Sequence, residues 1–195
     1  MGQKRIDFIS FEEFQKLYKA EKDKRMKLFI LLAFGSGLRI SEIVGYKRRT
    51  KRRMNRITKE ITFTPDDSEI PPLTKDKIDL VKHQIKIDDA KGGKWRITVT
   101  PPLLDERMLD ILPIKILRRT INNRLASLSM KVLGKKISPH TLRHGFGNYQ
   151  VNVNNVPLPI VQQMMGHSRL DTTGIYTKAN PEFAIQTAWK AMGGE

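Results

Sequence analysis

Residues 138–176 read SPHTLRHGFGNYQVNVNNVPLPIVQQMMGHSRLDTTGIY, and the rest of the chain is organised around this stretch. Ser138 followed by Pro139 predicts a helix start, because serine is a preferred N-cap and proline suits the first helical position. We expect this helix to end within 152–155. A shorter helix is expected over 159–165, where the following glycine stops it.

Four side chains in this stretch are suited to chemistry. His140 and Arg143 lie three apart and share one face of the first helix. His167 follows the second helix, Tyr176 comes nine residues later, and Asp171 is the one carboxylate of the stretch. Arginine offers a planar fork of donors for phosphate oxygens, and a tyrosine hydroxyl is a nucleophile once a base or cations assist it. The set therefore suits phosphoryl transfer through a covalent protein intermediate, without a metal.

The strings HTLRHGF and QQMMGHSRLDTTGIYT, in this order, resemble the second half of the catalytic domain of tyrosine recombinases, the phage integrase family. Singly, each of the four side chains is more often structural: a helix cap, a surface ion pair or a half-buried ring. The resemblance implies that Tyr176 attacks a backbone phosphorus and becomes a 3′-phosphotyrosine. It also implies that Arg143 and His167 donate to the non-bridging oxygens and that His140 helps to accept the tyrosine proton.

A second segment, GSGLRISEIVG at 35–45, resembles the first conserved box of the same family. Its glycines allow a tight turn, which predicts Arg39 at a helix start. Glu42, at i+3, is placed to hold the guanidinium. The resemblance implies that Arg39 contacts the scissile phosphate and that Glu42 steadies it; the alternative is a surface ion pair.

Two alternating runs, 84–87 and 95–99, are joined by a glycine-containing turn and predict a β-hairpin. The turn resembles the family's lysine loop, which implies that Lys91 protonates the leaving oxygen. Lys94 competes for this role and is otherwise a DNA contact. Ordinary turn chemistry also places lysines beside glycines.

A basic arm spans 47–59, where eight cations and no acid occur. We predict that it contacts DNA phosphates; the alternative is a solvated face. Alternation over 57–63 suggests a strand, and 65–72 has the composition of an acidic loop. The whole insertion, 47–80, is longer than the family usually carries. The predicted contacts are Lys47, Arg48, Arg49, Lys51, Arg52, Arg53 and Arg56.

Composition agrees with a nucleic-acid partner. The 195 residues carry a net charge of +16, which favours a polyanion. Cysteine is absent, so disulfides and thiol chemistry are excluded. No apolar run is long enough to span a bilayer, and no secretory signal is present. We expect an intracellular protein, in the cytoplasm, the nucleoid or a host cell, with no membrane partner, no metal and no cofactor.

The remaining segments predict helices. Ser10 opens a capping box, 26–34 is apolar nearly all round, and an apolar stripe runs over 117–132. Further helices are expected over 103–112 and 180–192. The predicted fold is mainly α with a small three-stranded antiparallel β-sheet, an α+β class similar to the tyrosine recombinase catalytic domain. We expect one catalytic domain over 1–195, without the family's N-terminal DNA-clamping domain.

The resemblance implies a site-specific DNA recombinase or integrase of a mobile genetic element, virus or plasmid, independent of metal and ATP. It would act on double-stranded DNA, as a homotetramer on DNA and a monomer alone. Type IB topoisomerase-like cleavage and rejoining, which reseals the same strand, is the nearest alternative. A non-catalytic DNA-binding module is another, although it would have no need for Tyr176. An RNA-binding role lacks any RNA-module signature.

Overall fold

The computed structural model describes residues 8–47, 50–54, 57–65, 69–88 and 95–166, and the side chains in these ranges except at 50–53 and 63–65. The helices are α1 (Phe11–Ala20), α2 (Lys24–Gly35), α3 (Ile40–Val44), α4 (Glu106–Leu109), α5 (Arg118–Leu133), α6 (Pro139–Asn152) and α7 (Leu158–Met165), with a 3₁₀ turn at Lys75–Lys77. The strands are β1 (Tyr46–Lys47), β2 (Thr50–Met54), β3 (Ile61–Pro65), β4 (Glu69–Ile70), β5 (Ile78–Asp79), β6 (Gln84–Asp88) and β7 (Trp95–Val99).

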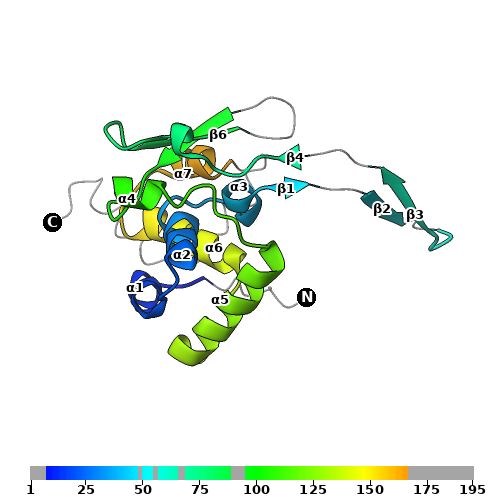
Figure 1. Ribbon diagram of the computed structural model, residues 1–195, viewed down its shortest axis with the longest axis horizontal. Coiled ribbons are helices and arrows are strands. Elements are labelled where there is room, and N and C mark those ends of the chain that lie inside the picture. The colour runs from blue at the N-terminus through cyan, green and yellow to red at the C-terminus, as the bar shows by residue number, and fades with distance from the viewer. Residues whose placement is uncertain (1–7, 48–49, 55–56, 66–68, 89–94, 167–195) are drawn as a thin grey trace, which may run out of the picture.

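Helix α2 forms the centre of the core. Every residue from Leu28 to Phe34 is buried, as the all-round apolar sequence predicts. The helix begins two residues earlier than expected, because the Asp23 side chain accepts hydrogen bonds from the amides of Arg25 and Met26. Helices α1, α5 and α6 surround it (Figure 1).

The helix ends follow the predicted capping residues. Ser10 accepts from the Glu13 amide at 3.2 Å while its own amide donates to the Glu13 carboxylate, so the capping box is confirmed. Ser138 caps α6, and Gly134 ends α5 in the left-handed conformation. The helix expected over 103–112 is reduced to α4, since the Asp105 side chain caps the Met108 amide and starts the helix late.

The predicted three-stranded antiparallel sheet is present, in the order β5-β6-β7. In β7 the polar side chains of Arg96 and Thr98 face the protein, whereas Trp95 is 63% exposed. Thr98 donates to the Ser36 carbonyl at 2.8 Å. Strand β7 therefore makes a polar contact at the end of α2, while Ile85 and Ile87 of β6 pack into the hydrophobic core.

Two short strand pairs lead out of the helical body. Strand β1 pairs with β4, and beyond them β2 pairs with β3 in a ribbon that projects away from the helices (Figure 1). The predicted strand begins at Ile61 instead of Ile57, because the chain turns at 57–58 and Lys59 has a left-handed φ of 60°. The expected acidic loop over 65–72 contains β4. Within the described ranges, no helix has the length and apolar character needed to cross a membrane.

Candidate active site

The first conserved box folds as a turn that presents Arg39. Gly37 is left-handed, with φ +64°, and a Cβ there would lie 2.4 Å from the Phe146 ring. Arg39 then caps α3, and its amide donates to Glu42 Oε2 at 2.7 Å. Its guanidinium Nη1 donates to Glu42 Oε1 at 2.8 Å. The predicted Arg39–Glu42 pair is therefore present, with Glu42 buried and the Arg39 side chain 39% exposed.

Arg143 lies on α6 and is almost fully buried, with 1% of its surface exposed. Its guanidinium donates to the carbonyl oxygens of Gly37 and Met165. These contacts tie the first box to the end of α7. The two predicted phosphate-binding arginines thus meet at one place, although residues 39 and 143 lie far apart in the sequence.

A third arginine, Arg96, joins them, and sequence reasoning missed it. Its Nη2 donates to Glu42 Oε2 at 2.8 Å, and its Nε donates to the Met164 carbonyl at 3.0 Å. The alternation in 95–99 gave no signal for it, because apolar residues at 95, 97 and 99 predict that Arg96 faces solvent. The partner itself could not be read, because Glu42 is 54 residues away.

The C-terminus of α7 is the point where all three arginines converge. The last carbonyls of a helix lack partners inside the helix and carry the negative end of its dipole. Here three carbonyls each accept a hydrogen bond from a guanidinium group: Met164 from Arg96, Met165 from Arg143, and Gly166 from Arg39 at 2.9 Å. We call this cluster the arginine junction; its members are Arg39, Glu42, Arg96, Arg143 and the carbonyls of 164–166.

The junction has an excess of positive charge. Burial alone would raise the pKa of Glu42, but the hydrogen bond and charge of Arg96, followed by the charge of Arg39, outweigh it and lower that pKa. Glu42 is therefore ionised and neutralises one of the three guanidinium groups. A site with a net charge of two, in which Arg39 is partly exposed, suits a phosphate anion.

His140 lies near the junction on the first turn of α6. Desolvation by the surrounding protein, then the charges of Arg143 and Arg39, lower the pKa of His140 below its usual value. His144 packs edge-on against it, with ring centroids 4.2 Å apart. Burial, then the proximity of His140 and Arg143, lower the pKa of His144 to about 4. Both imidazoles are neutral at physiological pH, which fits a proton acceptor at His140.

Several predicted residues lie outside the described part of the chain. These are Tyr176, His167, Lys91, Lys94, Arg48, Arg49 and Arg56, and the helix expected over 180–192. Lys51, Arg52 and Arg53 are placed by backbone only, on β2. Lys47 is exposed and forms an ion pair with Glu69 at 3.3 Å. The structure thus brings together four of the predicted residues, Arg39, Glu42, Arg143 and His140.

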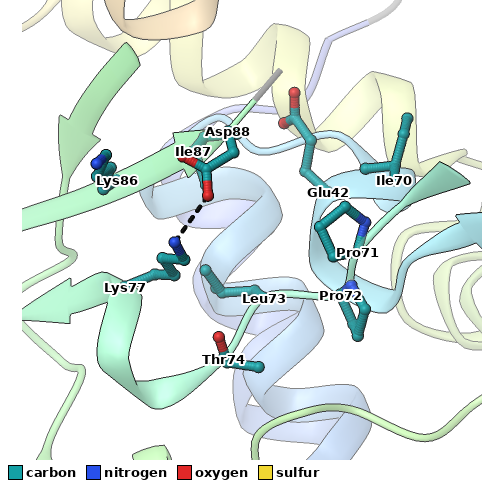
Figure 2. A pocket seen from close by; sticks show the side chains of 10 residues that line it. All are labelled: Glu42, Ile70, Pro71, Pro72, Leu73, Thr74, Lys77, Lys86, Ile87 and Asp88. Carbon is teal, nitrogen blue, oxygen red and sulfur yellow. Dashed lines mark ion pairs between the residues drawn. The ribbon is translucent and has the colours of Figure 1, made fainter. Parts of the chain in front are cut away.

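A pocket of about 130 Å³ has Glu42 among its lining residues (Figure 2). Its walls include Pro71, Pro72 and Leu73, and the Lys77–Asp88 ion pair, 2.7 Å long, lies at its edge. Lys77, Lys86 and Thr74 also line it, whereas none of the three junction arginines does. In the described part of the chain, no three His, Cys, Asp or Glu side chains gather as metal ligands would.

The chain belongs to the phage integrase family, whose sequence profile matches residues 7–182. It is 28% identical over 185 residues to the tyrosine recombinase XerA of Thermococcus kodakarensis, in an alignment covering 86% of this chain and 56% of XerA. The chain therefore spans about half the length of the curated relatives it matches.

Solved structures place the fold in the same group. A crystal structure of XerA recombinase superposes with a TM-score of 0.65 at 21% identity, covering 100% of this chain and 68% of that one. The catalytic domain of bacteriophage HP1 integrase gives a TM-score of 0.59 at 17% identity, with 95% of each chain covered. The fold is that of a tyrosine recombinase catalytic domain.

Proposed function

We propose that this chain is the catalytic domain of a site-specific recombinase, which cleaves and rejoins DNA strands through a 3′-phosphotyrosyl intermediate. The observation that carries the proposal is the arginine junction. Two arginines from distant segments converge beside an exposed histidine, in a chain of the phage integrase family. A module that only binds DNA has no need to bury and orient cations in this way.

Arg39 is the arginine best placed to bind the scissile phosphate first. Its bonds to Glu42 and Gly166 use two of roughly five guanidinium N–H groups. The remaining donors and its partial exposure allow it to bind a non-bridging oxygen, where negative charge develops in the transition state. Glu42 fixes the guanidinium plane, so little reorganisation is needed when the phosphate arrives.

Arg143 is proposed to bind the same phosphate from deeper in the protein. Because it is buried, a phosphate oxygen that contacts it must displace part of its cover. DNA binding is therefore expected to change the environment of the α7 end, where Arg143 is bonded to Met165. His167 follows this helix end directly in the sequence, and we assign it a further hydrogen bond to the non-bridging oxygens.

The nucleophile and the general acid are assigned to Tyr176 and Lys91, which lie outside the described ranges. Tyr176 attacks the phosphorus, and the 5′ oxygen leaves with a proton from Lys91. His140 helps to accept the tyrosine proton, and its lowered pKa supports this role because the neutral imidazole is the base. The phosphodiester energy is kept in the phosphotyrosine, so a 5′ hydroxyl from a second DNA reverses the step.

Double-stranded DNA is the proposed substrate, supported by the net charge of +16 and the basic arm. We further propose that the chain is monomeric alone and acts as a homotetramer on DNA inside cells. An origin in a mobile genetic element, virus or plasmid stays a prediction, which the family's phage members support.

The proposal is tested by searching for a covalent protein–DNA band. Plasmid or nicked DNA is incubated with the protein, quenched in detergent and separated by electrophoresis. We expect an adduct with the unaltered chain that persists in excess EDTA, and none with Tyr176→Phe, which keeps the ring and the DNA affinity. Strict magnesium dependence, or an adduct with Tyr176→Phe, would contradict the mechanism. Recombinant products, as opposed to relaxed plasmid alone, separate a recombinase from a topoisomerase.

A further inference from the structure

The proposed chemistry does not use Arg96, the third arginine of the junction. It lies on the inward face of β7 and is 8% exposed. Its two bonds point in different directions, one to the Glu42 carboxylate at 2.8 Å and one to the Met164 carbonyl at 3.0 Å. Arg96 thus links β7, the first conserved box at 35–45 and the end of α7.

Gly166 provides a second observation on Arg96. A Cβ at Gly166 would lie 2.8 Å from Arg96 Cδ and 3.0 Å from its Nε, so the arginine stem packs directly on this glycine. Gly166 also has a φ of +62°, which disfavours other residues. The glycine before His167 therefore serves both to end the helix and to admit Arg96.

The contacts close into a ring. Glu42 binds both Arg39 and Arg96, and these two arginines bind Gly166 and Met164 at the same helix end. Within such a ring, neither Arg39 nor the helix end can move without moving the other. Lysine at position 96 could not reproduce this, because its single ammonium lacks the planar fork that serves two acceptors at once.

We infer that Arg96 is a positioning residue, which sets Arg39 and the α7 end that precedes His167 around the non-bridging oxygens of the scissile phosphate. The inference rests on the proposed recombinase function. Arg96 acts through Glu42 and the Met164 carbonyl, so it has no contact of its own with the reacting atoms. The bland alternative is a buried ion pair that only stabilises the fold.

The test compares ordinary DNA with DNA that carries a neutral methylphosphonate at the cleavage site. Groups that stabilise charge on the non-bridging oxygens matter less when one such oxygen is replaced by methyl. Arg96→Lys should form the covalent adduct with ordinary DNA on the order of 10- to 100-fold more slowly at saturating DNA, as expected for displaced catalytic groups. On methylphosphonate DNA, relative to the unaltered chain, the defect should shrink to about threefold or less if the lost stabilisation is of this kind.

A matched control is Arg124→Lys. Arg124 also bridges two carboxylates, Asp23 at 3.0 Å and Glu21 at 3.4 Å, but on α5, outside the junction. It should leave adduct formation unchanged on both DNAs. Thermal melting confirms that each variant is folded; were Arg96→Lys unfolded, Glu42→Gln would be assayed the same way, since it weakens the same ring from the other side.

The outcomes distinguish a failure of the positioning role from a failure of the proposed recombinase function. An Arg96→Lys defect of equal size on both DNAs, or no defect, overturns the positioning role while the recombinase function stands. If the unaltered chain forms no adduct on ordinary DNA, the function fails and the inference with it. If the unaltered chain reacts with ordinary DNA but not with methylphosphonate DNA, the rate of the Arg39→Ala, Arg96→Lys double mutant on ordinary DNA is measured instead. A loss of rate smaller than the sum of the two single losses, in free energy, supports the ring, and a fully additive loss overturns the positioning role.

Discussion

The arginine junction and the basic arm are both rich in cations, but they hold them in opposite ways. In the junction, all three guanidinium groups bind one helix end, and two of them also bind one buried carboxylate. In the arm, cations are carried by a two-stranded ribbon that projects from the helical body (Figure 1). A two-stranded ribbon has little stability of its own, and its pairing does not fix long side chains against a core.

This difference separates geometry from affinity. Buried cations with several partners are held in one arrangement, which suits transition-state stabilisation. Cations on a projecting ribbon add to phosphate attraction, which depends on salt and tolerates imprecise placement. Substitutions in or beside the junction should therefore change the rate of strand cleavage, while substitutions in the arm should change only binding.

The largest effect on cleavage in this comparison is expected for Lys91, in the turn between β6 and β7. Lys91→Ala should slow cleavage of ordinary DNA on the order of 10²–10⁴-fold, because a departing alkoxide needs a proton from the general acid. DNA with sulfur at the 5′ bridging position should restore most of the rate, since a thiolate leaves without a proton and its thiol pKa is only about 8.5.

The control for that experiment is the pair of junction arginines. Variants of Arg39 or Arg143 should show no comparable rescue by sulfur, because these side chains act on the non-bridging oxygens. Rescue of Lys94→Ala in place of Lys91→Ala would transfer the role to Lys94. If neither lysine variant is rescued, the proton has another source and the hairpin lysines serve only to hold DNA.

The next effect distinguishes Arg39 from Arg143 within the junction. Arg39→Ala and Arg143→Ala should each slow cleavage about 10²–10³-fold, as the loss of one oxyanion donor does. Only Arg143→Ala should also destabilise the fold, by about 2–5 kcal/mol, because it leaves the buried carbonyls of Gly37 and Met165 without a donor. Arg39→Ala should cost about 1 kcal/mol or less, since its side chain is partly exposed. Urea melts alongside cleavage rates check this; equal destabilisation by both would contradict the difference in burial.

A smaller effect concerns His144, which packs against His140; it changes the stability of the fold at acidic pH and is absent at neutral pH. The pKa of His144 is lowered from 6.5 to about 4 in the folded protein, so the unfolded chain takes up this proton first as the pH falls. Stability should therefore drop between about pH 6.5 and 4, by at most about 3 kcal/mol from this group, since solvent screening reduces the effect. His144→Gln should flatten that part of the stability–pH curve. An unchanged slope would show that His144 is charged in the fold.

Local patterns in the sequence predicted much of this architecture. Ser10, Ser138 and Gly134 mark helix ends because capping is decided within a few residues, and Glu42 was paired with Arg39 for the same reason. Arg96 could not be placed. Its partners lie 54 and 68 residues away, and alternation alone cannot tell which face of a strand is inward.

The same reasoning explains the errors in the insertion. The pairing of β1 with β4 joins segments that flank the ribbon, and strands of two residues leave no periodic signal. The turn at Lys59 interrupts an alternation that appeared continuous from Ile57. Apolar residues in β7, such as Trp95, face outward while Arg96 and Thr98 face inward, because the inward face of this strand meets Glu42 and the Met164 and Ser36 carbonyls.

The smallest effect on the chemical step is expected in the arm. Changing Arg48, Arg49, Arg52 and Arg53 together to Ala should leave the cleavage rate at saturating DNA unchanged, because none of them belongs to the junction. It should weaken binding and flatten the log–log dependence of affinity on salt, by up to about 3.6 if all four contact phosphates at roughly 0.9 each. Binding is measured by anisotropy over a range of salt concentrations.

The matched control for the arm removes the same charge from the helical body. Lys16, Lys19, Lys22 and Lys24 are exposed on α1, in the segment that follows it and at the start of α2, and changing all four to Ala also lowers the net charge from +16 to +12. General attraction between protein and DNA would flatten the salt slope equally in both variants. Direct contact by the arm would flatten it only in the arginine variant, because counterions are released where phosphates are neutralised at close range. Equal slopes in the arm variant and the unaltered chain would instead make the ribbon a solvated surface, and the contrast with the junction would then be one of stability alone.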